Sequence, residues 1–299
     1  MEVSQGFSHD AKSLRKGTWA AIASYGLWGL FPIYWKQITY IDSVHILCHR
    51  MLWSAVFLLI VAKLCGLTGQ LIPIFRQKKS FFAVATCSAL ITINWGTYIW
   101  AVNSGHVTES SLGYYITPLM SVALGCFFFQ EKMDKWTLVA VVVAAVGVAV
   151  ASGMIGKLPW ISLSLATSFS VYGAIKKKVG LDALAGLTAE TLLATPFVLV
   201  CLLWARYAGW GHFFGPGIKS VLFLVIAGPV TALPLLAFAY AANRIPLQRI
   251  GFIQYLSPTI QLMLGLMVYG ENLSYPMMLA FATVVFAVVI YLATRRWQV

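Results

Sequence analysis

The feature that most constrains this chain is a series of long apolar stretches that recurs along nearly its whole length. A bilayer core is about 30 Å thick, and a helix needs roughly 20 mostly apolar residues to cross it. Only 10% of the 299 residues are charged and 60% are hydrophobic, far from the balance of a soluble domain. The pattern predicts an all-α integral membrane protein embedded in the lipid bilayer. We expect ten transmembrane helices, at 17–38, 44–63, 80–101, 107–130, 136–153, 160–176, 183–204, 217–242, 247–269 and 276–294.

The basic residues predict the orientation of the chain. The formal net charge is +12, but the lysines and arginines gather at the ends of the apolar stretches, so we expect no nucleic-acid partner. Sixteen of the 21 fall in one set of alternate loops and at the termini. Because basic loops stay inside, the tail 1–16 and the C-terminus 295–299 should both be cytoplasmic. The tail carries no cleavage signature.

Two segments repeat each other half a chain apart, YITPLMSVALGCFFFQE at 115–131 and YLSPTIQLMLGLMVYGE at 255–271. The identical pairs, always 140 positions apart, are Tyr115 and Tyr255, Pro118 and Pro258, Leu124 and Leu264, Gly125 and Gly265, and Glu131 and Glu271. Each half, 17–153 and 159–294, would hold five spans, an odd number, so the second half enters the membrane from the opposite side. Inverted-topology repeats are typical of secondary transporters, whose substrate site lies between the halves. The matched prolines predict kinked helices.

Several segments resemble one family of transporters. They are SYGLWGLFPIYWKQI, HILCHRMLWS, INWGTYIWAVNSGHVTESSLGYYITPL, AGPVTALPLLAFAYAANRIPL and GFIQYLSPTIQLMLGLMVYGE. Together they are similar to the RarD branch of the EamA family, in the drug/metabolite transporter superfamily, over about 17–294. The resemblance implies two inverted five-helix EamA repeats in the bacterial inner membrane. It also implies secondary transport of small metabolites or drugs. Relatives in the superfamily export amino acids, and the branch is named for sensitivity to chloramphenicol.

Two ionisable residues fall well inside predicted spans, Arg50 and Glu190, and they are counterparts under the 140-residue shift. A charge at a helix centre costs about 2.5–3.5 kcal/mol on insertion scales, so such residues usually face a cavity or a partner. One interpretation is that Arg50 binds an anionic group of the substrate and Glu190 couples transport to protons. The alternatives are that Arg50 snorkels to the outer interface, that Glu190 makes an internal salt bridge or a cap, or that the two pair directly.

Neutral and aromatic side chains complete the predicted substrate site. Its members supply hydrogen bonds or flat walls for an amphipathic substrate: Asn94, Gln254, Trp28, Trp95, Tyr114, Tyr115 and Tyr255. We expect His49 to be packed, Glu109 to complement the N-terminus of its own helix, and Glu271 to be a structural turn residue. Gly113 should allow close helix packing.

The sequence favours a transporter that works by alternating access and is linked to protons. A passive facilitator and a non-transporting membrane scaffold or sensor are the alternatives. There is no Walker A motif, no HExxH and no paired intramembrane aspartates, so neither ATP-driven transport by this chain nor an enzyme is expected. The five scattered cysteines have no metal or redox spacing, and we expect no metal or cofactor.

Overall fold

The protein is helical throughout the part of the chain that can be described. The computed structural model describes residues 3–129, 134–208, 214, 216–242, 244–245 and 253–295, and these residues form no β-strand. Six of the described helices are long and apolar enough to cross a bilayer, and two further apolar helices, Leu256–Val268 and Tyr275–Tyr291, are shorter. The predicted all-α membrane class is confirmed. The start of the predicted span 247–269, and Glu131, lie outside the described residues.

The helices form two compact units, and each unit takes segments from both halves of the chain. The first unit comprises Met1–Ala89 and Leu181–Ser257, and the second comprises Leu90–Gly180 and Pro258–Val299. Helix α4, Lys78–Asn103, begins in the first unit and ends in the second. A five-helix half is therefore not a compact unit by itself.

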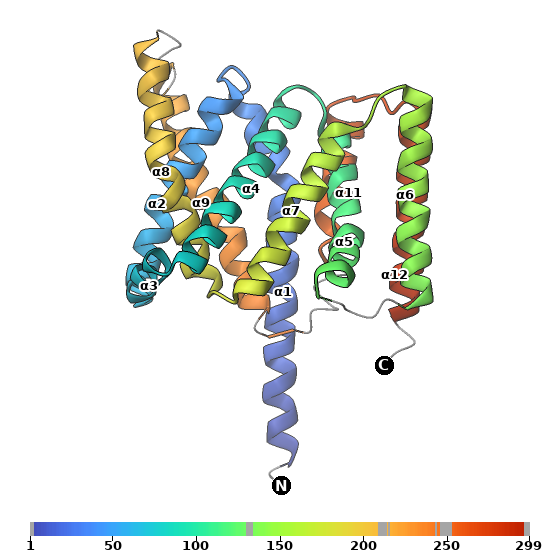
Figure 1. Ribbon diagram of the computed structural model, residues 1–299, viewed down its shortest axis with the longest axis horizontal. Coiled ribbons are helices and arrows are strands. Elements are labelled where there is room, and N and C mark those ends of the chain that lie inside the picture. The colour runs from blue at the N-terminus through green and yellow to red at the C-terminus, as the bar shows by residue number, and fades with distance from the viewer. Residues whose placement is uncertain are drawn as a thin grey trace. The chain divides into compact units, whose positions relative to one another are not determined.

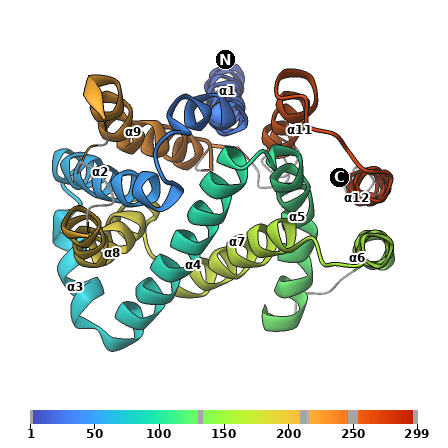
Figure 2. The same ribbon diagram turned by 90° about the horizontal axis from the view of Figure 1, so that it is seen from above.

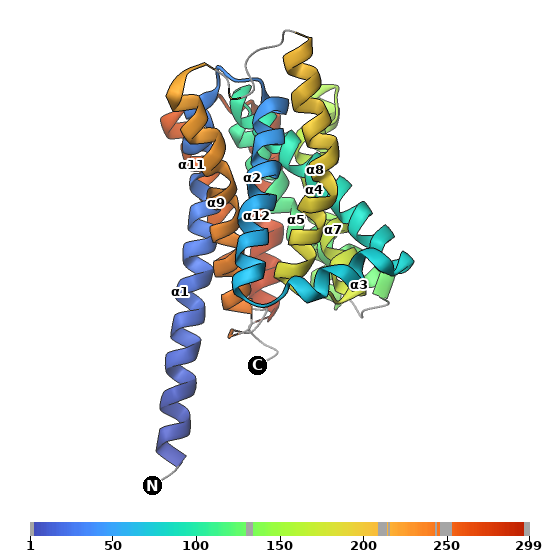
Figure 3. The same ribbon diagram turned by 90° about the vertical axis from the view of Figure 1, so that its left-hand side faces the viewer.

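In the first unit, α2 packs against both α8 and α9, and α9 also packs against α1 (Figures 2 and 3). Helices α2 and α8 run antiparallel (Figure 1). Each begins at an aspartate, Asp42 or Asp182, whose side chain accepts two N–H bonds from the first turn. Such caps fix where a helix starts. The helices are α1 Val3–Trp35, α2 Ser43–Leu64, α8 Ala183–Tyr207 and α9 Gly217–Ala242, with a 3₁₀ turn at Lys36–Ile38.

Two segments of the first unit are more ordered than the sequence predicted. Helix α1 already begins at Val3, inside the predicted polar tail. The segment between the predicted spans 44–63 and 80–101 contains a 3₁₀ turn, Thr68–Gln70, and helix α3, Leu71–Arg76. This segment is helical because Leu71 and Ile74, three positions apart on α3, pack with Ala185 and Ala189 of α8.

In the second unit, α6 packs along α12 and α5 packs against α7. Helices α6 and α12 are antiparallel (Figure 1). A Cβ atom added to Gly113 on α5 would lie 2.8 Å from the Ser162 carbonyl oxygen, so the prediction that Gly113 allows close packing is confirmed. The helices are α5 Val107–Phe129, α6 Lys135–Ile155, α7 Trp160–Val179, α11 Leu256–Met263, a π-helical turn at Leu264–Val268 and α12 Tyr275–Arg295.

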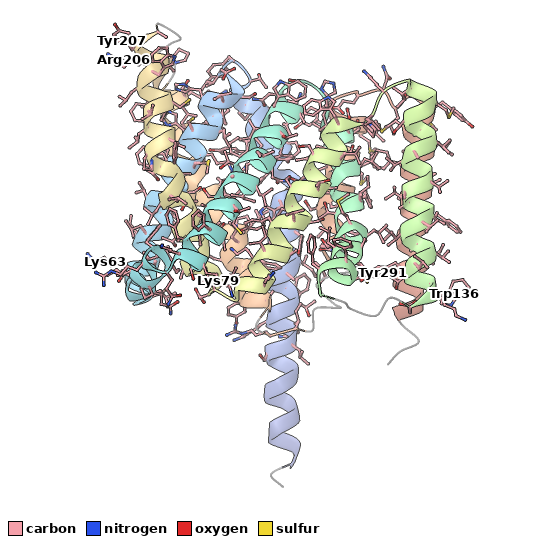
Figure 4. All side chains as sticks on the ribbon, viewed as in Figure 1. Lys63, Lys79, Trp136, Arg206, Tyr207 and Tyr291 are labelled. Carbon is pink, nitrogen blue, oxygen red and sulfur yellow. The ribbon has the colours of Figure 1, made fainter. Side chains whose placement is uncertain are left out.

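Three basic residues of the first unit lie at opposite ends of its helices. Figure 4 shows Lys63 and Lys79 at one end of this unit and Arg206 at the other. The sequence assigned Lys63 and Lys79 to the cytoplasmic loops and Arg206 to the opposite side. The three side chains thus lie at the two opposite ends that the sequence predicted, and which end is cytoplasmic stays a prediction.

Candidate functional site

The buried Arg50 on α2 is the centre of the candidate site in the first unit. Its side chain is only 3% exposed. Its Nε donates a hydrogen bond of 3.0 Å to the hydroxyl of Thr231 on α9. The guanidinium carbon lies 5.2 Å from the ring centroid of Trp35 and 5.7 Å from that of Phe31. Aromatic faces attract a cation at these distances, which offsets part of the cost of removing it from water.

The aromatic partners of Arg50 come from one stripe of α1. Trp28, Phe31 and Trp35 follow each other at spacings of three and four, so they share a face of the helix. Phe31 and Trp35 are buried and meet edge to face, and Trp28 contacts Phe238 of α9. The Nε1 atom of Trp35 is buried and has no hydrogen-bond partner among the described residues. The stripe therefore offers flat apolar walls and an indole N–H close to a cation.

Glu190 lies on α8, the helix that packs along α2. Its side chain is 1% exposed, and its backbone carbonyl accepts a hydrogen bond of 2.8 Å from Ser88 of α4. Arg50 and Glu190 each lie seven residues into their helix, or about 10 Å along it at the α-helical rise. Because α2 and α8 run antiparallel, these two depths are counted from opposite ends of the helix pair (Figure 1).

His49 is packed, as the sequence predicted. The residue is completely buried, and its Nδ1 accepts a hydrogen bond from the indole of Trp53. Its ring also lies against those of His45 and Phe214. These contacts are typical of a histidine with a structural role.

Asn94 connects three helices of the second unit. Its Nδ2 donates bonds of 3.0 Å to the Leu165 carbonyl and to the Ser168 hydroxyl, both on α7. Its Oδ1 accepts a bond of 3.4 Å from Tyr114 of α5. Both amide donors are thus used within the protein, which leaves acceptor capacity on Oδ1 for a substrate. The role of Asn94 in binding stays a prediction.

The other predicted site residues divide between the two units. Trp95 and Tyr115 of the second unit are buried, and the Tyr115 hydroxyl lies 2.6 Å from that of Thr259. Tyr255 is buried and Gln254 is half-buried, and both belong to the first unit. The candidate site therefore consists of two groups, one around Arg50 and one around Asn94.

Two carboxylates, Glu271 and Glu109, lie at the N-terminus of α5 or contact it. Glu271 accepts hydrogen bonds from the backbone N–H groups of Val107 and Thr108, both 2.7 Å, and from the Thr108 hydroxyl. It therefore caps α5, and its predicted structural role is confirmed. Glu109 lies in the first turn of its own helix, α5, as the sequence predicted, and it also accepts a bond from the Ile161 N–H in the first turn of α7. The hydrogen bonds to the first N–H groups of α5 come from Glu271, which is distant in sequence.

Sequence reasoning missed Phe31, Trp35 and Thr231 as partners of Arg50. The spacing of aromatic residues on α1 was a signal that could have identified two of them. Nothing in the sequence pattern marks Thr231, which reaches Arg50 only because α2 and α9 pack together. Of the described residues, none form a cluster that could hold a metal ion.

Several helices long and apolar enough to cross a bilayer, with charged and polar groups buried between them, define a multi-pass membrane protein. Comparison with known proteins narrows this class. Residues 15–153 match the EamA-like transporter family. The chain is 36% identical to protein RarD of Escherichia coli over 282 residues, 94% of this chain and 95% of that protein. The chain belongs to the RarD branch of the EamA family.

Other relatives agree with this assignment. The chain is 40% identical to "uncharacterized transporter YojE" of Bacillus subtilis over 291 residues, 95% of this chain and 96% of that protein. It is 27% identical to the chloramphenicol-sensitive protein RarD of Pseudomonas aeruginosa over 260 residues, 86% of each chain. A solved crystal structure superimposes with a TM-score of 0.57 at 15% identity, covering 92% of this chain and 96% of the other. That likeness concerns the fold alone.

Proposed function

We propose that the chain forms ten transmembrane helices as two inverted five-helix repeats and transports small metabolites or drugs across the bacterial inner membrane by alternating access. The helix boundaries support the repeat. Helix α8 begins 140 positions after α2, and α12 begins and ends 140 positions after α6. Both of these pairs are antiparallel (Figure 1), which is the relation that an inverted repeat requires. The matched caps Asp42 and Asp182 belong to the same pattern.

The buried Arg50 is the observation that carries the substrate proposal. A guanidinium binds a carboxylate through a planar set of donors, and a site of low water content strengthens that attraction. The rings of Trp28, Phe31 and Trp35 would contact the apolar body of the same molecule. We infer a small anionic or zwitterionic substrate with a flat or amphipathic body, such as an amino acid. Chloramphenicol, in the name of one relative, is a second candidate that shares the flat amphipathic body.

Glu190 is the proposed proton-coupling residue. A carboxylate buried in a membrane protein changes its protonation state when a nearby cation or the local water content changes. In the proposed cycle, Glu190 binds a proton on one side of the membrane and releases it on the other. Passive facilitation is the competing mechanism, and it needs no titrating group.

Flux in proteoliposomes tests both parts of the proposal. The full chain would be reconstituted with aromatic and aliphatic amino acids and chloramphenicol as substrates, with and without an imposed pH gradient. Accumulation that an uncoupler abolishes would support proton-linked transport. Exchange that ignores the gradient would establish a facilitator and leave Glu190 a structural residue. Absence of flux for every compound would contradict the proposed substrate class.

Two variants assign the roles. Glu190→Gln should abolish accumulation driven by the pH gradient while exchange between equal substrate pools continues. Asp182→Asn is the matched control, because it removes a negative charge from the exposed start of the same helix and asparagine caps equally well. Arg50→Lys keeps the charge but loses the planar fork, and we expect it to raise the KM for anionic substrates about tenfold. An unchanged KM would remove Arg50 from the binding site.

A further inference from the structure

A cavity of about 110 Å³ lies at one end of the helices of the second unit, and neither Arg50 nor Asn94 lines it. It is formed where α4 and α6 end and α5 and α7 begin, and all of its lining residues belong to this unit. The aromatic rings in the lining are those of Trp100, His106 and Trp160. The Trp100 and His106 rings are stacked, 5.5 Å apart and inclined by 17°, and Trp160 lies 5.2 Å from Trp100.

The same cavity is lined by one acidic and one basic side chain, Glu109 and Lys157. The Lys157 charge attracts the Glu109 carboxylate, but among the described residues no salt bridge joins the two. Glu109 is half-buried and uses one acceptor site for the Ile161 N–H, so further lone pairs remain. Lys157 is exposed on the turn between α6 and α7. The lining therefore presents a separated negative and positive charge.

His106 adds a polar atom that the protein does not use. Its Nδ1 is buried and has no hydrogen-bond partner among the described residues. Burying a nitrogen without a partner is unfavourable, and a bound polar group would remove that cost. The other acidic residue nearby, Glu271, is occupied by the N-terminus of α5 and does not line the cavity.

We propose that this cavity is a second binding site, for a small zwitterion that carries an ammonium group next to an anionic group. Glu109 receives the ammonium, with the faces of Trp100 and Trp160 beside it, because aromatic faces and a carboxylate both attract an organic cation. Lys157 receives the carboxylate or phosphate. Two sources have this chemistry, a free amino acid and the headgroup of phosphatidylethanolamine. The cavity lies at the helix ends, where tryptophans mark the membrane–water interface and both sources are present.

Calorimetric titration of the purified full chain in detergent tests the proposal. The zwitterionic probes are glycine and dihexanoyl-phosphatidylethanolamine. Dihexanoyl-phosphatidylglycerol, which lacks the amine, and ethylammonium, which lacks the anion, are the comparison probes. We expect a zwitterion to bind the wild type, and the Kd to rise at least tenfold in Glu109→Gln and in Lys157→Gln.

The variants are chosen to leave the fold intact. In Glu109→Gln the amide oxygen of the new side chain can still accept the Ile161 N–H, and Lys157 is exposed. The matched control Lys219→Gln changes another exposed lysine, in the first unit, and should bind like the wild type. Binding of glycine alone identifies a free zwitterion, and binding of the lipid alone identifies a headgroup; either supports the site. The proposal is overturned if neither zwitterion binds, if both pocket variants bind as the wild type does, or if the comparison probes bind equally well.

Discussion

The contact between α5 and α7 at Gly113 leads to a quantitative prediction. A methyl group at this position would lie 2.8 Å from the Ser162 carbonyl oxygen, 3.0 Å from the Ser162 Cα and 3.1 Å from the Leu165 Cβ, where ordinary contacts begin at 3.4 Å. All three atoms belong to α7, so relief requires this helix to move away by several tenths of an ångström. That movement would also strain the hydrogen bond of 2.6 Å from the Ser162 hydroxyl to the Glu109 carbonyl.

Overpacking of this kind costs typically 1–3 kcal/mol, against a gain of roughly 0.5–1 kcal/mol when alanine replaces glycine inside a helix. We therefore expect Gly113→Ala to destabilise the protein by about 1–2 kcal/mol. Gly173→Ala is the matched control, since Gly173 lies on α7 and a methyl group added there would meet no atom within 4 Å. Its expected effect is neutral or slightly stabilising.

Thermal unfolding would be measured on detergent-solubilised protein. The measured quantity is the fraction of the protein that still elutes as a single species after heating. Wild type and both variants would be compared in the same detergent. The explanation is refuted if Gly113→Ala melts at or above the temperature of Gly173→Ala. That result would mean that the helix pair can separate at no cost.

Three further predictions concern single contacts. Thr231→Val removes the acceptor of the Arg50 Nε and should destabilise the protein by roughly 1–3 kcal/mol. Thr231→Ser keeps a hydroxyl and should melt like the wild type. Equal melting temperatures of the two variants would contradict the predicted role of the hydroxyl. Asp42→Ala and Asp182→Ala each remove two N-cap bonds, and each should lower the stability by about 1 kcal/mol in the same assay. A loss of stability in only one of the two variants would argue against equivalent caps. Glu271→Gln leaves one acceptor oxygen in place of two, so one N–H bond at the start of α5 is lost and the other loses its charge, at a cost of about 1–2 kcal/mol. A melting temperature like that of the wild type would show that water replaces the cap.

Much of the helical organisation was accessible from the sequence. Asp42 and Asp182 stand 140 positions apart, and in the structure each of them starts a helix. Length and apolarity also identified the spans of α2, α6, α8 and α9. These features are local, because they depend on composition over one helix and on the capping residue before it.

The environment of the candidate site was less accessible. Arg50 could be recognised because a charge inside an apolar span is costly, but its contacts with Trp35 and Thr231 depend on how α1, α2 and α9 pack. Glu271 caps a helix that begins 164 positions earlier, and no periodicity reports such a contact. Sequence patterns thus identify which residues are costly to bury and leave open which groups surround them.

The discontinuous composition of the two units has a consequence for biosynthesis. The first unit is not complete until the ribosome has made Ser257, and the second requires the segment from Pro258 onward. Helices inserted early, such as α1 and α6, must remain in the bilayer until their main packing partners, α9 and α12, have been translated. A chain that stops after Gly180 would leave both units without essential helices, so early termination yields no folded half. Folding would then be all-or-none with respect to chain length, because neither unit is complete in a truncated chain.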